Sequence, residues 1–190
     1  MSGLFGSVSF WIILVLVLIV LWIIVTANKL TRKRMKAEQA FADMDVYLTQ
    51  RYDLIPNLVS TVKGYSKHEK ETFEAVVKAR NAAVSATDMN AKIDADNNVT
   101  EAIGKLFALA EAYPELKANE NFVKLQDSLE SVEKDLVGAR RYFNAAAQAY
   151  NFATKVIPDC IVAKIFGYQP MSMFTATEDQ RQYVKVDFEN

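Results

Sequence analysis

The sequence predicts an all-α protein in which an N-terminal transmembrane helix continues into an elongated, antiparallel, up-down helical bundle with coiled-coil-like packing. Three observations predict it. The first 28 of the 190 residues contain no charged side chain, apolar residues follow a 3-4 spacing over most of residues 30–157, and the last part of that range keeps five uninterrupted heptads. We divide the chain into an external N-terminus with the transmembrane helix (1–28), a basic juxtamembrane collar (29–36), a helical bundle (37–157), and a short apolar helix with a C-terminal tail (158–190).

The first segment is predicted to span the membrane once. Sixteen consecutive apolar residues run from Phe10 to Val25, and the uncharged stretch around them covers the ~20 residues that a spanning helix needs. A cleaved signal peptide would carry its positive charge before the apolar core, whereas here all the charge follows it. Trp11 and Trp22 lie near the two ends of the core, where indole rings favour the headgroup layer.

The basic collar sets the expected orientation. Its five positive residues have no acidic neighbour before Glu38; they are Lys29, Arg32, Lys33, Arg34 and Lys36. The positive-inside rule keeps such a flank in the cytoplasm, which predicts a single-pass protein of the cell (inner) membrane with its short N-terminus outside and its bundle in the cytoplasm. The collar either attracts anionic lipid, at ~1 kcal/mol per residue, or acts only as a topology signal.

Composition argues against several functional classes. The collar holds five of the 22 basic residues, which leaves 17 against all 23 acidic residues in residues 37–190, a formal charge of −6. Nucleic-acid binding needs clustered positive charge, so no nucleic-acid partner is expected. One Cys and one His argue against disulfide scaffolds and multi-His metal sites, and no Gly-rich phosphate loop or paired-carboxylate motif occurs. We therefore predict no catalytic, metal or cofactor-binding residues and no enzyme activity.

The first bundle helix carries one charged residue on its apolar stripe. Thr26 to Ala40 contains neither Gly nor Pro, so one helix is expected from the membrane to about Lys63, with Pro56 as the point where it would kink or split. Arg51 interrupts the stripe formed by Phe41, Met44, Leu48, Ile55, Leu58, Val62 and Tyr65. Because burying an unpaired guanidinium is costly, we expect an acidic partner on the long last helix, unless Arg51 reaches solvent from a loose seam. The candidate partners are Glu130, Glu133 and Asp135.

Two shorter helices are expected next. Ser66 and Glu69 have the spacing of a capping box, which predicts a second helix that begins near Lys67. Its apolar face comprises Phe73, Val76, Val77, Ala83 and Val84. The polar stretch 87–98 is predicted to be an internal loop, followed by a third helix over about 100–113 that Pro114 ends.

The long last helix shows the clearest periodicity. One apolar set is spaced by seven and another is interleaved with it: Phe122, Leu129, Leu136, Phe143, Tyr150 and Ile157, then Leu125, Val132, Ala139, Ala146 and Ala153. Pro158 should end this helix. Counting helix directions in an up-down bundle returns its end to the bilayer, where Asp159 could cap a short helix. The apolar segment 158–174 then either touches the headgroup layer or only closes the base of the bundle.

Specific strings give the chain a family resemblance. They are RYDLIPNLV at 51–59, VKGY at 62–65, HEKET at 68–72, AYPELKANENF at 112–122, ARRYFN at 139–144, YN at 150–151, FGY at 166–168 and KVDF at 185–188. With the N-terminal span, the chain resembles the LemA family of bacterial membrane proteins. The resemblance implies an N-terminal anchor, a cytoplasmic antiparallel helical body and no catalytic residues. It also raises the expectation of a partner at the membrane, with a membrane protease as one candidate.

The resulting functional hypothesis is a membrane-tethered interaction module, a scaffold or adaptor. Its expected partners are membrane lipid and another membrane protein. One alternative is a small-ligand sensor or enzyme with a pocket between helices, which convergent ionisable side chains would favour. The other is a self-assembling structural protein, because anchored rods meet at high effective concentration and could form a homo-oligomer.

Overall fold

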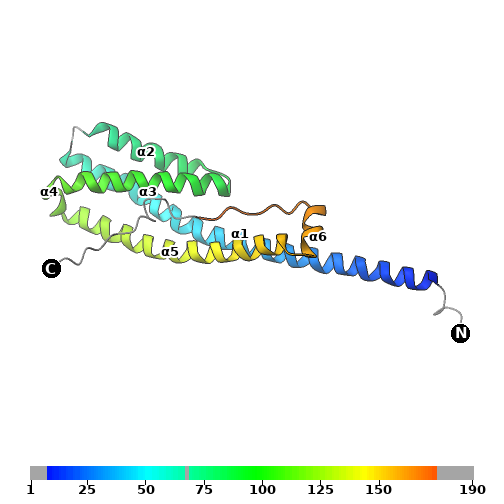
Figure 1. Ribbon diagram of the computed structural model, residues 1–190. Helices are drawn as coiled ribbons and strands as arrows, with labels where there is room; N and C mark the ends of the chain where they lie inside the picture. The colour runs from blue at the N-terminus through cyan, green and yellow to red at the C-terminus, as the bar shows by residue number, and fades with distance from the viewer. Residues whose placement is uncertain (1–7, 67–68, 175–190) are drawn as a thin grey trace, which may run out of the picture. The chain divides into compact units, whose positions relative to one another are not determined.

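A computed structural model describes residues 8–66 and 69–174 of the chain (Figure 1). The predicted all-α class is confirmed, since these residues form helices and no strand. In chain order the helices are α1 (Val8–Tyr65), α2 (Lys70–Ser85), α3 (Met89–Glu111), α4 (Pro114–Lys117), α5 (Glu120–Lys155) and α6 (Asp159–Ile165). The tail 175–190 lies outside the described residues.

Helix α1 confirms the prediction of one uninterrupted helix. Its 58 residues pass through the basic collar and through Pro56 without a break. The apolar first part is long enough to cross a membrane, and none of its most apolar stretch is buried within the structure. Further along the same helix, Leu30, Met44 and Leu48 are fully buried. A single element therefore contains both an exposed apolar segment and a buried helix face.

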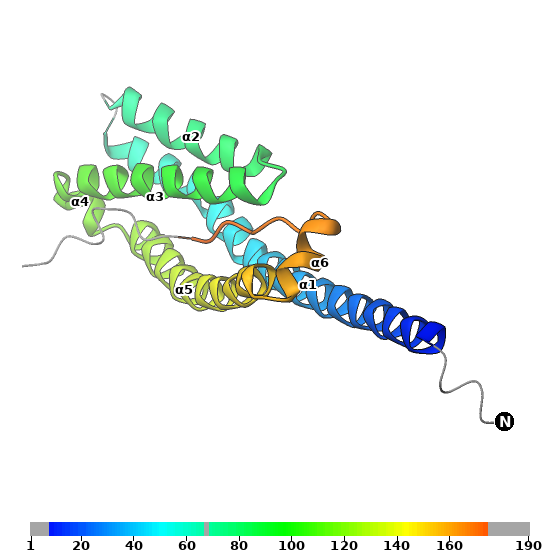
Figure 2. The same cartoon turned by 45° about the vertical axis from the view of Figure 1, so that its right-hand side comes forward.

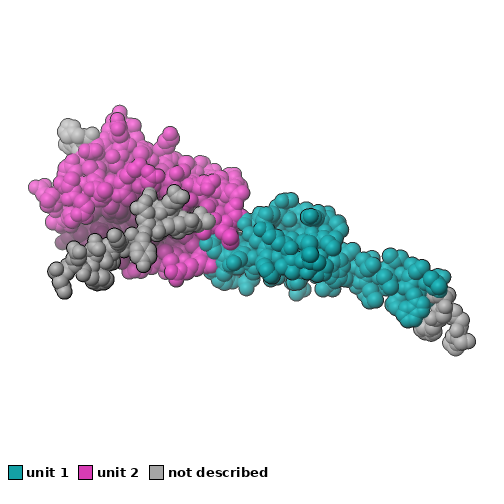
Figure 3. Space-filling model, in the orientation of Figure 1, with its two compact units in different colours: residues 1–40, 142–171 teal, residues 41–141, 172–190 magenta. Residues whose placement is uncertain are grey.

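The chain divides into two compact units, coloured separately in Figure 3. Unit 1 comprises residues 1–40 and 142–171, and unit 2 comprises residues 41–141 and 172–190. Helices α1 and α5 contribute to both units, α6 belongs to unit 1, and α2, α3 and α4 belong to unit 2.

Unit 2 buries the stripes that the sequence predicts. Met44, Leu48, Ile55, Leu58 and Val62 of α1 are buried, as are Phe122, Leu129 and Leu136 of α5 and Phe73, Val76 and Ala83 of α2. Val77 and Val84 of the predicted α2 face remain about half exposed. Repeating apolar side chains at helical spacing thus form the core of this unit, as expected for packed amphipathic helices.

The predicted loop at 87–98 is wrong. Helix α3 begins at Met89, eleven residues before the predicted start, and Asp88 caps it by accepting a hydrogen bond from the backbone N–H of Ala91 at 2.9 Å. A buried stripe continues through the polar stretch and consists of Ile93, Asp96, Val99, Ile103, Leu106 and Ala110. A carboxylate at one core position interrupted the apolar periodicity and concealed this half of the helix.

The structure also corrects the predicted capping box at the start of the second helix. Helix α2 begins at Lys70, and Glu69 at its N-cap position makes no side-chain cap hydrogen bond. Ser66 instead extends the end of α1, because its backbone N–H donates to the Val62 carbonyl at 3.1 Å. The Ser66 hydroxyl is buried and finds no hydrogen-bond partner among the described residues. His68, two residues further along the chain, lies outside the described residues.

In unit 1 the last turns of α5 and helix α6 pack against the part of α1 that joins the apolar segment to the collar (Figure 2). Leu30, Ala153, Val162 and Ala163 form a buried cluster. Alanine recurs at the buried positions of this unit, which include Ala37, Ala40, Ala146, Ala147, Ala153 and Ala163. Phe143 and Tyr150 of the heptad series are fully buried here, but Ile157, expected to continue that series, is 80% exposed beyond the end of α5.

Candidate functional site

The first candidate site is a buried ionic cluster in unit 2, centred on Asp96 of α3. The Asp96 side chain is completely buried, and that of Arg51 from α1 is 4% exposed. Arg51 Nη1 donates to Asp96 Oδ1 at 2.9 Å and to the Thr100 hydroxyl at 3.0 Å. The charge that interrupts the stripe of α1 therefore meets the charge that interrupts the stripe of α3.

A second arginine and a second carboxylate from α5 complete this cluster. Arg140 Nη2 donates to Asp96 Oδ2, and Glu133 lies between the two arginines. Its Oε2 is 3.2 Å from Arg51 Nε, and its Oε1 is 3.4 Å from Arg140 Nη1. The Nε atoms of both arginines are not directed at an acceptor, so the Arg51–Glu133 contact is an ion pair and not a hydrogen bond. The two arginines and two carboxylates cancel in formal charge.

Tyr52 joins the Asp96 cluster from α1. Its hydroxyl donates to Asp96 Oδ1 at 3.2 Å. Burial raises the pKa of Tyr52 well above its ordinary value, and the nearby Asp96 carboxylate raises the pKa further. The phenol therefore stays protonated at physiological pH and remains a hydrogen-bond donor.

The structure brings together only part of the predicted Arg51 site. Glu133 contacts Arg51, whereas Glu130 pairs with Lys134 of its own helix at 2.8 Å. Asp135 is exposed and forms no ion pair with the described residues. The main partner, Asp96, was missed because it lay in the predicted loop. The signal that could have found it is the 3-4 spacing that relates Asp96 to Ile93, Val99 and Ile103.

A groove between α3 and α5 opens beside the Asp96 cluster, with a volume of about 390 Å³. Arg51, Glu130 and Glu133 line it together with apolar residues that include Ile103, Phe107 and Leu129. Convergent ionisable groups are the feature that favours a ligand pocket. The charge of Arg51 is already matched by Asp96 and Glu133, so this groove offers a ligand mainly apolar surface.

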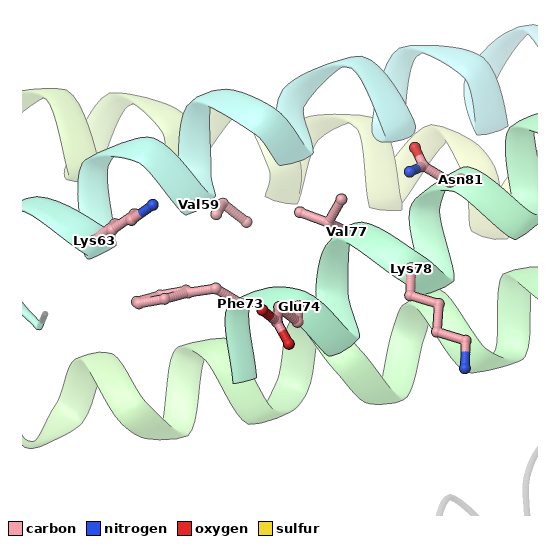
Figure 4. A pocket seen from close by; sticks show the side chains of 7 residues that line it. All are labelled: Val59, Lys63, Phe73, Glu74, Val77, Lys78 and Asn81. Carbon is pink, nitrogen blue, oxygen red and sulfur yellow. The ribbon is translucent and has the colours of Figure 1, made fainter. Parts of the chain in front are cut away.

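A second groove lies between α1 and α2 and measures about 440 Å³ (Figure 4). Val59 of α1 and Val77 of α2 point toward one another across it, and Phe73 contributes a buried ring beside them. Lys63, Glu74, Lys78 and Asn81 complete its lining. An apolar floor with a charged border is typical of surfaces that bind other proteins. No group of three or more His, Cys, Asp or Glu side chains that could hold a metal occurs in the described residues.

The basic collar lies in unit 1, and acidic neighbours engage two of its five residues. Lys29 Nζ is 2.7 Å from Asp159 Oδ2, and Arg34 Nε donates to Glu38 Oε1 at 2.8 Å. The hydrogen bond to Glu38 raises the pKa of Arg34 above its ordinary value. Arg32 and Lys36 are exposed, and Lys33 is partly buried.

Contacts around Asp159 agree with the predicted return of the chain after α5 to the collar. The Asp159 carboxylate does not cap α6, whose N-cap residue is Pro158, but binds Lys29 instead. The Tyr168 hydroxyl lies 2.7 Å from that of Thr31. Trp11 is exposed, whereas Trp22 is partly buried against the Leu30 cluster.

Comparison with known proteins identifies a family whose members resemble this chain in sequence. The LemA family model matches residues 40–188. Protein LemA of Metamycoplasma hominis is 20% identical over 156 residues, which are 81% of this chain and 71% of that protein. Magnetosome protein MamQ of Magnetospirillum gryphiswaldense is 31% identical over 84 residues, 44% of this chain, and MamQ 2 of Paramagnetospirillum magneticum is 30% identical over the same length. The match spans only 31% of each MamQ protein.

Proposed function

We propose that this chain, which belongs to the LemA family, is a membrane-tethered helical interaction module that acts as a scaffold or adaptor through its surface. The continuity of α1 carries the proposal. Its exposed apolar segment is long enough to match the thickness of a bilayer. The helix then continues without a break into positions that are fully buried in the helical part of the chain after residue 28, here called the body. Such a helix joins a membrane anchor directly to a folded domain.

The proposed topology is single-pass, in the cell (inner) membrane, with the N-terminus outside and the body in the cytoplasm. The positive collar directly after the apolar segment supports it. Trypsin digestion of inverted and right-side-out membrane vesicles tests it. The body contains many Lys and Arg residues, so it should be cleaved only in inverted vesicles. Cleavage of the body in right-side-out vesicles would show that the body lies outside and would contradict the proposed topology.

The charge balance of the Asp96 cluster supports interaction over catalysis. A catalytic acid, base or nucleophile needs an ionisable group that reaches substrate. Here both arginines and both carboxylates are used within the cluster, and Tyr52 is committed to Asp96. The groove between α1 and α2 is the surface that we assign to a membrane-protein partner, with a membrane protease as one candidate.

Photo-crosslinking from the intact membrane tests the interaction at this groove. Val77 and Val123 have the same side chain and nearly the same exposure, 43% and 42%, but only Val77 lines the groove between α1 and α2. A crosslinking amino acid at Val77 should capture one recurrent membrane protein that the same amino acid at Val123 does not. Equal capture at both positions would reject the assigned surface. Capture of a second copy of this chain at Val77 would favour the self-assembly alternative.

The groove between α3 and α5 supports a second candidate function, a sensor of a small and mainly apolar ligand. Gly104 lines this groove, and a Cβ added there would meet nothing within 4 Å. Gly104→Leu should therefore fill the groove without disturbing the helices. A compound that raises the thermal stability of the natural protein but not of Gly104→Leu would support a sensor. Equal effects on both proteins would reject this groove as the ligand site.

A further inference from the structure

Helix α6 is held at a defined height along α1. Its buried residues Val162 and Ala163 pack with Leu30 of α1, and Trp22 and Ile23 of α1 lie against the same cluster. Two polar contacts support this packing: Lys29 of α1 pairs with Asp159 of α6, and the Thr31 hydroxyl of α1 lies next to that of Tyr168, three residues after α6 ends. All of these residues belong to unit 1. The height of α6 is therefore set by residues 22–31 of α1.

That height coincides with the expected edge of the bilayer. At 1.5 Å per residue, a hydrocarbon layer about 30 Å thick takes about 20 residues of helix. Counted from Val8, where α1 begins, it ends close to Ala27. The headgroup region occupies roughly the next 5–7 Å on that side. Residues 22–31 therefore straddle the boundary between acyl chains and headgroups, and α6 lies beside this boundary.

The outer side of α6 and its flanks is strongly apolar. Ile161 and Ile165 are four residues apart, so they share one face of the helix, and they are 52% and 68% exposed. Ile157 and Phe166, which flank the helix in sequence, and Phe152 in the last turn of α5 are also more than half exposed. Lys164 is exposed on the same helix, and Lys29 is neutralised by Asp159. A surface of this composition is unfavourable in water.

The direction of α6 suits a helix that lies flat in a membrane surface. In both views of the molecule, α6 lies beside α1 and is steeply inclined to the neighbouring part of that helix (Figures 1 and 2). A helix steeply inclined to a spanning helix at the bilayer boundary runs along the interface, where one apolar face and a few basic residues are the typical pattern.

We propose that α6, with the flanking residues Phe152, Ile157 and Phe166, is an interfacial helix whose exposed apolar face inserts at the boundary between headgroups and acyl chains. This proposal deepens the proposed function and rests on the anchor being in the membrane. The bilayer is the occupant that the contacts favour, because the anchor that sets the height of α6 is itself the membrane-spanning segment. The protein would then contact the membrane through a span and a second, lateral surface.

Spin-label accessibility in lipid vesicles tests the proposal with the full-length chain. Cys160→Ala removes the single cysteine, and single cysteines then replace Val17, Ile165 or Tyr142, all of which are about half exposed or more. Tyr142 is the matched control in unit 1, because it lies 13 residues before the end of α5, or about 20 Å along the helix. Collisions with oxygen, which concentrates in acyl chains, are compared with collisions with a water-soluble nickel chelate.

The expected result is a several-fold higher ratio of oxygen to nickel accessibility at Ile165 than at Tyr142, with the highest ratio at Val17. A high ratio at Val17 with equal ratios at Ile165 and Tyr142 would overturn the interfacial helix and leave the anchor intact. A low ratio at Val17 would overturn the anchor and the interfacial helix together. Protection of Ile165 from both reagents would identify a protein partner at α6 and equally overturn insertion into lipid.

Discussion

Two ionic sites, one in each unit, differ in how much solvent reaches them. In unit 2 the side chains of Arg51 and Asp96 are 4% and 0% exposed, and in unit 1 those of Lys29 and Asp159 are 54% and 13% exposed. A buried charge is costly to leave without a partner, whereas an exposed pair is screened and contributes little. The Asp96 cluster should therefore help to determine how the helices of unit 2 pack. The Lys29–Asp159 pair forms where two segments meet at the collar and should contribute little to stability.

The largest expected effect comes from breaking the Asp96 cluster. Asp96→Asn keeps the shape of the side chain but leaves Arg51 and Arg140 with only Glu133 to balance them. Because Arg51 is almost fully buried, the free energy of unfolding should fall by about 3–5 kcal/mol. Chemical denaturation of the protein in detergent measures it. Asp94→Asn, two residues away and exposed, is the matched control and should change the free energy by less than about 0.5 kcal/mol.

A smaller effect is expected at Tyr52, where it also depends on pH. Tyr52→Phe removes the hydrogen bond to Asp96 and should lower the free energy of unfolding by about 1–2 kcal/mol near neutral pH. The raised pKa means that the folded protein holds the phenol proton more tightly than the unfolded chain. The stabilisation that the protonated phenol gives the folded protein is therefore complete below the ordinary tyrosine pKa of about 10, and it is lost as pH rises above that value. The alkaline decline in stability should therefore be shallower in Tyr52→Phe, and an unchanged decline would contradict the buried hydrogen bond.

A double-mutant cycle separates the partners of Arg51 on α5. Coupling between Arg51→Leu and Glu133→Gln should be about 1 kcal/mol, because the ion pair is partly exposed and its Nε is not aligned for a hydrogen bond. The cycle of Arg51→Leu with Asp135→Asn should show no measurable coupling. Equal coupling in the two cycles would mean that Arg51 interacts with the overall negative charge of α5 and not specifically with Glu133.

The smallest effect should occur at the Lys29–Asp159 pair. Coupling between Lys29→Gln and Asp159→Asn should be about 0.5 kcal/mol at low salt and should fall as salt is added, since Lys29 is half exposed. Thermal unfolding in detergent at two ionic strengths measures it. A coupling as large as that of the Arg51–Glu133 cycle would contradict the expectation that the exposed pair stabilises the protein less than the buried cluster does.

The sequence predicted the elements whose periodicity is uninterrupted. The apolar N-terminal segment and the lack of Gly and Pro between Thr26 and Ala40 were sufficient for the long helix α1, and the heptads of α5 located its buried face. The prediction failed where one polar residue occupies a core position. Asp96 looked like part of a loop because its burial depends on Arg51, which is 45 residues away in the chain.

The prediction from sequence also failed for contacts that depend on tertiary packing. Ser66 and Glu69 have the spacing of a capping box, but the hydroxyl is buried and Glu69 makes no capping hydrogen bond. Asp159 has the residue type of a helix cap, but Lys29 of a distant segment binds its carboxylate. In both cases the local pattern was correct as a propensity, and neighbours that the local sequence does not reveal decided the outcome.

The alanines that recur at the buried positions of unit 1 make its tolerance to mutation one-sided. A side chain at Ala37, Ala40 or Ala147 can lose at most one methyl group, which limits the cavity that any substitution can create. Enlarging it forces close-packed helices apart and typically costs about 1–3 kcal/mol. In a library of random substitutions, increases in volume at these positions should therefore be more harmful than serine or than glycine, which costs about 1 kcal/mol in a helix interior. The reverse pattern is expected for the leucine-rich positions of unit 2.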